Sequence, residues 1–415
     1  MKLFRDLLCA GLAAIIALLT GEVLLRLTGL KYEASFFTPE PERAYALRPN
    51  AEGWQTTEGQ YYVHINSAGM HDREHSLPRP AGTIRIAVIG SSEAEAKQLS
   101  PGENFASVLE RTLNRKLEGS GRRVETLNFG VAGYNLAQIY LTLHNHVWQY
   151  DPQIVLLPYS NYLVLKNTPA LSPEGLNKAR FMTVRDGNIE PDASSRAEMA
   201  RRPDTRRLRQ RNRAADLMNR SQLICLANYA LINLSHELSA WKSARPMARA
   251  SSVQPSSPGL PSDYAAVWPA LSPEDQSPRP DPRLVQASEV GDAIFRQMNR
   301  EAGEHHSEFW LIVLDLPVQV HPVEARRSEF LKKNGMASLD RSERRLVAFC
   351  AANDIRAVAL APAILPSIPP GVAIRGFPGR EAGDGHYNQT GHKLIGEYLA
   401  AKLYRDSSAF AHPAP

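Results

Sequence analysis

The apolar positions of this chain alternate between short continuous runs and spaced, helix-like patterns. Thr83 to Ile89 is apolar except for Thr83 and Arg85 and ends at Gly90, which predicts a buried strand. From Asn104 to Leu117 the apolar side chains recur on one face, as in an amphipathic helix. The same pattern then predicts a strand, a helix and a third strand: Val124–Phe129, Leu136–Trp148 and Gln153–Leu157. Strands that alternate with helices at this spacing indicate an α/β fold with a parallel sheet.

The alternation stops at about residue 168 and resumes near 285. In between, a polar stretch leads to an Arg-rich part that we predict to be helical, and Ser251–Pro282 is rich in Pro and Ser, as in a flexible linker. The elements predicted after the insertion are a helix near 285–303, a strand Phe309–Leu314, a helix near 338–353, a strand Ala357–Leu360 and a helix Thr390–Tyr404. We therefore divide the chain into an N-terminal segment (1–30), an extension packing on the core (31–80), an α/β domain (81–167 with 285–408) and an insertion (168–284).

The N-terminus resembles a membrane-targeting segment. Lys2 and Arg5 precede an apolar run from Leu7 to Thr20, and Glu22 interrupts the run before it resumes. The run is long for the core of a signal peptide, and no small-x-small cleavage pattern follows it. We favour an uncleaved single-pass anchor, with Lys2 and Arg5 in the cytoplasm and the body on the periplasmic or extracellular side. The alternative is a cleaved signal and a secreted protein.

The positive charge of the chain is local. Arg196–Arg220 holds nine Arg against three acidic residues, a surplus of six, so the rest of a chain with net charge +5 carries about −1. This balance does not favour nucleic-acid binding. The Arg-rich stretch is either a solvated helical face or a contact for an acidic polymer or anionic lipid headgroups near the anchor.

Cysteine and histidine spacing gives no sign of a cofactor. With only Cys9, Cys225 and Cys350, neither a disulfide framework nor a paired zinc motif can form. A single Cys225–Cys350 bridge stays open, but we favour two free thiols. His144 and His146, two residues apart on a predicted helix, do not have zinc spacing. We expect neither a metal nor another cofactor.

Candidate catalytic chemistry lies at the ends of the predicted strands. Ser92 follows the first strand after Gly90, and ligands bind beyond the carboxyl ends of parallel strands. Gly133 follows the second strand and Asn161 the third. We predict that the amides of Ser92 and Gly133 and the side-chain amide of Asn161 form an oxyanion hole. Taken singly, each has an ordinary explanation: a helix cap, a turn glycine and a loop asparagine.

The fourth segment is Asp384-Gly-His386, just before the last predicted helix. An Asp two residues before a His can turn back to its Nδ1–H and fix the tautomer, which leaves Nε2 free to take the proton of Ser92. We therefore predict a triad of Ser92, His386 and Asp384.

Together these segments resemble the blocks of the SGNH (GDSL-type) hydrolase superfamily. Ser92, Gly133, Asn161 and His386 match its serine, glycine, asparagine and histidine positions in order, and Ile65–Asp72 is similar to the lead-in of anchored bacterial members. The resemblance implies a flavodoxin-like three-layer α/β/α sandwich. It also implies metal-independent ester hydrolysis or acyl transfer, often the deacetylation of carbohydrate.

Three positions depart from the family pattern. Ser91 stands where the usual Asp precedes the nucleophile, the Asn161 block keeps only its donor, and Asp384 is two rather than three residues before His386. The first hypothesis is therefore an esterase or deacetylase that acts on an acyl ester, first of all acetyl, of a cell-envelope or exported carbohydrate. The alternatives are an O-acyltransferase with the same triad, or a catalytically inactive envelope binding protein on the same scaffold. Catalysis requires that Ser92 Oγ lie within hydrogen-bond reach of His386 Nε2.

Overall fold

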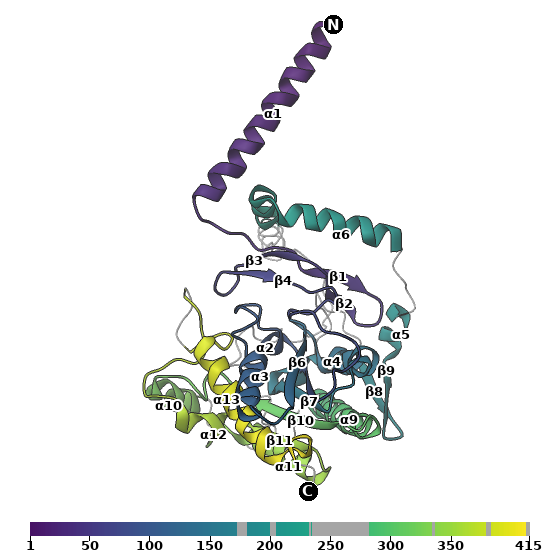
Figure 1. Ribbon diagram of the computed structural model, residues 1–415, viewed down its shortest axis with the longest axis vertical. Helices are drawn as coiled ribbons and strands as arrows, with labels where there is room; N and C mark the ends of the chain where they lie inside the picture. Colours follow the sequence, from purple (N-terminus) through teal and green to yellow (C-terminus); the bar gives the residue numbers. More distant parts are fainter. Residues whose placement is uncertain are drawn as a thin grey trace, which may run out of the picture.

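A five-stranded parallel sheet forms the centre of the molecule (Figure 1). The computed structural model describes residues 1–171, 181–199, 205–231, 234, 282–333, 337–378 and 383–411. The strands lie in the order β11-β10-β7-β5-β6, which is the flavodoxin-like order. Their bounds are β5 Thr83–Gly90, β6 Arg123–Gly130, β7 Ile154–Ser160, β10 Glu308–Leu314 and β11 Arg356–Ala359.

Helices cover both faces of this sheet, which makes every residue of β5, β7 and β10 buried. One face packs against α3 (Phe105–Lys116), α12 (Leu360–Ile364) and α13 (Gln389–Asp406). The other packs against α4 (Leu136–Thr142), α9 (Pro282–Glu304) and α11 (Arg341–Ala352). A further helix, α10 (Glu324–Lys333), follows β10 and has no buried residue. The three-layer α/β/α sandwich predicted from the sequence is confirmed.

The strand register brings the candidate loops to one edge of the sheet. Gly90 at the end of β5 pairs with Gly130 at the end of β6, and β7 pairs with β5 on the other side. The loops that follow β6, β5 and β7 therefore begin side by side at the carboxyl edge. The short helix α2 (Ser92–Glu95) and the 3₁₀ helix η3 (Asn161–Lys166) start there.

One predicted helix ends earlier than expected. The prediction ran to Trp148, but the α-helix stops at Thr142 and continues as a π turn (Leu143–Val147) and a 3₁₀ turn. The irregular turns bring His144 Nδ1 to 3.0 Å and Trp148 Nε1 to 2.6 Å from the same oxygen of Glu301. Hydrophobic periodicity does not reveal such a shared polar partner.

Two antiparallel hairpins form the N-terminal extension and lie against the sheet domain (Figure 1). They are β1 (Phe37–Glu40) with β2 (Ala44–Leu47), and β3 (Glu52–Gln55) with β4 (Tyr61–His64). Tyr45 donates its hydroxyl hydrogen bond to the Ala132 carbonyl at 2.8 Å, and Asp72 accepts the Asn128 amide of β6 at 2.9 Å. These contacts hold the extension beside the loops that follow β5 and β6.

The described part of the insertion packs in two places. The hairpin β8 (Met182–Arg185) and β9 (Asn188–Pro191) contacts α9, whereas α6 (Thr205–Asn219) contacts β1 and β3; α5 (Ala193–Met199) lies between them in the chain. The predicted Pro- and Ser-rich linker, 251–282, lies outside the described residues except for Pro282, which begins α9. Cys225 and Cys350 are both free and buried.

The N-terminal segment is one helix, α1 (Lys2–Leu27), that extends away from the body (Figure 1). It has 26 residues, none of them buried, and is apolar enough to cross a membrane. This is compatible with a membrane anchor or a signal sequence.

Candidate active site

Ser92 begins the short helix α2 directly beyond β5. Two glycines allow this helix to lie against the strand ends. A Cβ atom on Gly130 would stand only 2.3 Å from the amide nitrogen of Glu95, and one on Gly90 would stand 2.8 Å from Cβ of Ala94. Because the helix is packed this closely, Ser92 is half-buried at the carboxyl edge rather than free on a loop.

His386 meets Ser92 directly. Its Nε2 atom lies 2.8 Å from Ser92 Oγ, which is hydrogen-bond distance for proton transfer from the hydroxyl. The histidine belongs to the loop before α13, whose N-cap Asn388 accepts the Gly391 amide at 3.1 Å. The structure therefore brings together two residues that are 294 positions apart in the sequence.

The carboxylate that binds the other nitrogen of His386 is Glu58, not Asp384. Glu58 Oε2 lies 2.6 Å from His386 Nδ1 and also accepts the His386 backbone amide at 3.3 Å. Glu58 comes from the turn between β3 and β4, in the N-terminal extension. Asp384, which the sequence analysis assigned to this position, is exposed.

The backbone around Asp384 gives the physical reason for this correction. Gly383 and Gly385 have φ angles of +97° and +81°, so the chain turns on both sides of Asp384 in a conformation that other residues rarely adopt. A Cβ atom on Gly385 would stand 2.8 Å from Glu58 Oε1. The glycine leaves the space that the Glu58 carboxylate occupies beside the histidine.

The surroundings of His386 raise its pKa. Burial by itself would lower the pKa, but the hydrogen bond to Glu58 and the negative charges of Glu93 and Glu58 outweigh it. Glu93 keeps a lowered pKa despite its burial, because Arg375 and His386 favour its charged form. The site thus stabilises the imidazolium that forms when His386 takes a proton.

A buried network around Arg375 joins the serine helix to the histidine loop. Arg375 Nη1 donates to Glu93 Oε1 at 2.8 Å and to the Gly385 carbonyl at 2.9 Å. Its Nε donates to Asp315 Oδ2 at 2.9 Å, and Asp315 also accepts the Tyr387 hydroxyl. Because Glu93 follows Ser92 and Tyr387 follows His386, this network links the segments that carry Ser92 and His386.

Gly133 and Asn161 follow the two strands that flank β5. Gly133 lies in the turn after β6 with φ +83°, and the preceding residue, Ala132, donates its amide to Glu95 of α2. The turn is therefore tied to the helix that Ser92 begins.

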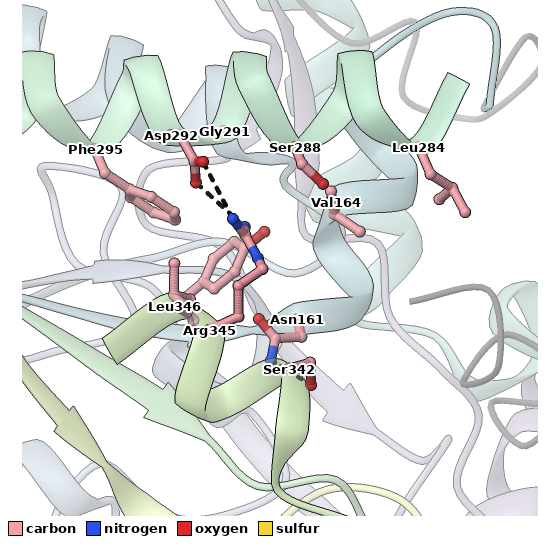
Figure 2. Close-up of a pocket in the computed structure, with 11 residues that line it drawn as sticks. Asn161, Val164, Leu284, Ser288, Gly291, Asp292, Phe295, Ser342, Arg345 and Leu346 are labelled. Atoms are coloured by element: carbon pink, nitrogen blue, oxygen red, sulfur yellow. Dashed lines mark hydrogen bonds and ion pairs between the residues drawn. The ribbon is translucent and has the colours of Figure 1, made fainter. Parts of the chain in front are cut away.

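Asn161 lies beside a small cavity between η3, α9 and α11 (Figure 2). Its side-chain Nδ2 donates to Ser342 Oγ at 3.1 Å. Across the cavity, Arg345 of α11 bridges both oxygens of Asp292 of α9 at 3.3 Å. The amide that the sequence analysis assigned to the oxyanion hole is thus held by α11 in this structure.

Ser91, which stands where the resemblance has Asp, accepts the amides of Ala94 and Glu95 with its backbone carbonyl, but its side chain makes no hydrogen bond within the described part of the chain. Its Oγ is buried without a hydrogen-bond partner.

Among the residues that the structure describes, no group of three or more His, Cys, Asp or Glu side chains is arranged to hold a metal ion.

Comparisons with known proteins give only distant similarity. No protein-family model matches the chain, and no curated protein matches it. A lipolytic protein of the G-D-S-L family from Desulfitobacterium hafniense is similar over 76% of this chain and 98% of its own, with 12% identity and a TM-score of 0.32. The lipase/acylhydrolase from Enterococcus faecalis covers 77% of this chain and 95% of its own, with 13% identity and a TM-score of 0.33. A mutant of an acetyl-xylooligosaccharide esterase from Geobacillus covers 78% and 95%, with 9% identity and a TM-score of 0.36. The solved structures to which the chain is similar thus include hydrolases of the GDSL type.

Proposed function

We propose that this chain is a serine ester hydrolase in which Ser92 is the nucleophile, His386 the general base and Glu58 the residue that orients the base. The observation that carries the proposal is the continuous line of hydrogen bonds from Ser92 Oγ through His386 to Glu58, with distances of 2.8 and 2.6 Å. A nucleophile, a base and an orienting carboxylate in this order are the parts that acyl transfer to serine requires.

The proposed reaction has two halves. His386 Nε2 takes the proton of Ser92 Oγ while that oxygen attacks the ester carbonyl, and the tetrahedral intermediate collapses as the protonated histidine gives the proton to the leaving alcohol. Water, deprotonated by the same histidine, then attacks the acyl-enzyme and releases the carboxylic acid and Ser92. Glu58 keeps Nδ1 protonated and stabilises the imidazolium.

We assign the oxyanion to the backbone amides of Ser92 and Gly133 and to the side chain of Asn161. The three positions follow adjacent strands, which supports this assignment. The Asn161 amide then exchanges its hydrogen bond with Ser342 for one to the developing oxyanion. Such a donor typically contributes about 10²- to 10³-fold in rate.

As substrate we propose a short acyl ester, first of all acetyl, on a cell-envelope or exported carbohydrate. Support comes from α1, whose length and hydropathy suit an anchor that keeps the body at the outer face of the membrane. In this arrangement the protein is a single-pass membrane protein with its hydrolase domain on the periplasmic or extracellular side.

The test is hydrolysis of p-nitrophenyl acetate by the full-length protein in detergent, together with labelling by a fluorophosphonate. Ser92→Ala and His386→Ala should each lower kcat/KM by about 10⁴-fold or more. Ser91→Ala is the matched control, because Ser91 is the neighbouring serine and its Oγ has no hydrogen-bond partner within the described residues; this variant should keep both activity and labelling. Wild-type protein that is no faster than Ser92→Ala, and that takes no label, would show that the proposal is wrong.

A further inference from the structure

The carboxyl-terminal end of α1 is bound by the insertion. Glu22 accepts hydrogen bonds from Ser221 Oγ at 2.8 Å, the Gln222 amide at 3.1 Å and the Leu223 amide at 3.0 Å. Arg26 Nη2 donates to the Arg220 carbonyl at 2.7 Å. Glu22 thus caps the first turn of a second apolar helix, Gln222–Leu231, whose first amides have no partners within the helix itself.

The length of α1 fixes where this contact would lie in a bilayer. A helix rises 1.5 Å per residue, so the roughly 30 Å hydrocarbon core takes about 20 residues. With Lys2 and Arg5 at one headgroup layer, Glu22 and Arg26 reach the opposite one. The helix Gln222–Leu231 therefore begins at the level of the lipid headgroups.

The exposed side chains of this region are unusually apolar for a water-facing surface. Leu217 is 67% exposed, Tyr229 54%, Leu231 66% and Leu234 56%. They lie within 18 residues of each other and next to the anchor. Large exposed apolar side chains gathered this closely beside an anchor indicate a membrane or protein contact.

The helix α6, which carries Leu217, also carries exposed cations. Five of its arginines are exposed: Arg206, Arg207, Arg209, Arg211 and Arg213. Figure 1 shows α6 ending near the lower end of α1 and running at a steep angle to it, so that it would lie along the membrane surface rather than through it.

The opposite face of α6 is fixed to the N-terminal extension. Asn212 accepts from the Thr38 hydroxyl at 3.0 Å, Asp216 pairs with the buried Arg48, and Asn219 binds both the Ser35 amide and the Glu52 carbonyl at 2.9 Å. These contacts hold the arginine-bearing side of α6 away from the body.

We infer that α6 and the helix Gln222–Leu231, which we call the interfacial platform, lie on the outer surface of a bilayer with anionic headgroups. The apolar side chains enter the headgroup boundary and the arginines bind the phosphates, as in interfacial amphipathic helices. Continuity with α1 and charge complementarity favour a bilayer over an acidic polymer. The inference rests on α1 being retained as an anchor, and not on the catalytic activity of Ser92.

The platform would also hold the hydrolase domain in one orientation. Asn219 binds β3, the strand that leads into the turn carrying Glu58. The helix α6, which would contact the membrane, and Glu58 are therefore both attached to the β3–β4 hairpin.

The first arm of the test measures depth. Full-length protein carrying Leu231→Cys, in a Cys9→Ala background, is spin-labelled in nanodiscs that contain phosphatidylglycerol. The collision rate of the spin label with oxygen is then compared with its collision rate with a water-soluble nickel chelate. Leu365→Cys is the matched control, since Leu365 is another exposed leucine, 38% accessible, in the 3₁₀ helix Leu365–Ser367 far along the chain. We expect the label at 231 to favour oxygen several-fold over the label at 365. Equal access to water at both positions would overturn the inference.

The second arm tests the charges. The triple variant Arg209→Gln, Arg211→Gln, Arg213→Gln should move the label at 231 toward water in anionic nanodiscs, and wild-type protein should show the same shift in purely zwitterionic ones. The variant Lys332→Gln, Lys333→Gln removes cations from another basic helix, α10, and should change nothing. No dependence on lipid charge, or displacement of the label by a soluble acidic polysaccharide, would contradict a bilayer as the partner. Because the triple variant should still hydrolyse p-nitrophenyl acetate at the wild-type rate, failure here is distinguishable from failure of the proposed catalysis.

Discussion

The loops after β5 and β7 begin at the same edge of one sheet, yet they are used differently. The first carries Ser92, which meets His386 and, through it, Glu58 from the N-terminal extension. The second carries Asn161, whose amide is bound by Ser342 of α11 beside a small cavity. Each of these two side chains is placed by the end of a strand, but its hydrogen-bond partner comes from a segment elsewhere in the chain.

The largest effect on kcat should come from changing Glu58, and the carboxylate to compare it with is Asp384. Glu58→Gln removes the charge that stabilises the imidazolium and favours the tautomer, so kcat should fall by about 10³- to 10⁴-fold. Asp384→Asn, the matched change at the exposed carboxylate, should leave kcat within a few-fold of wild type. Steady-state hydrolysis of p-nitrophenyl acetate measures both. A large loss in Asp384→Asn with Glu58→Gln nearly intact would reverse the assignment.

The next largest effect should be on the free energy of unfolding, when the Arg375 network is broken. Arg375→Met leaves Asp315 and Glu93 buried without their cation, which should cost about 3–5 kcal/mol of unfolding free energy. Arg344→Met removes a cation from an exposed pair with Asp340 and should cost no more than about 1 kcal/mol. Urea unfolding followed by circular dichroism compares the two variants. Equal stability losses would mean that the buried network does not hold the histidine loop.

Removing the Asn161 amide should have a smaller effect, confined to catalysis. Asn161→Ala should lower kcat by about 10²- to 10³-fold with little change in KM, as expected for a donor used in the transition state. Ser342→Ala releases the amide from its partner in α11, and its kcat should be equal to or above that of wild type. If the two variants lose activity to the same extent, Asn161 serves the packing of α11 and not the oxyanion.

The smallest effect is a shift of the pH profile. The neutral form of His386 is the base and its pKa is raised, so kcat/KM should fall with decreasing pH below a midpoint above the ordinary histidine value of about 6.5. Glu58→Gln removes a cause of the raised pKa, so the residual activity should have its acid limb at lower pH. A limb at the same or higher pH in this variant would show that Glu58 does not interact with the imidazolium.

Much of the fold followed from local patterns. β5, β6, β7 and β10 were each predicted to within a few residues, because a strand buried on both faces is a continuous apolar run. Glycines end both β5 and β6. The same patterns placed Ser92 at a strand end and His386 before the last helix. The helix after β6 was predicted too long; its π and 3₁₀ turns bring His144 and Trp148 to Glu301, which lies on another helix.

The sequence by itself determined the alternation of strands and helices, the apolar N-terminal helix and the two residues that we propose as nucleophile and base. These depend on apolar periodicity and on residue types near strand ends, which are local properties. The tertiary structure alone decided which carboxylate binds His386, where the Asn161 amide donates and which segment binds the carboxyl-terminal end of α1. Glu58 lies 328 residues before His386 and has no distinguishing neighbours in the sequence, whereas Asp384 has the expected spacing. Spacing brings a carboxylate near a histidine along the chain, but the positive φ angles of Gly383 and Gly385 and the packing of the β3–β4 hairpin determine which carboxylate reaches its ring.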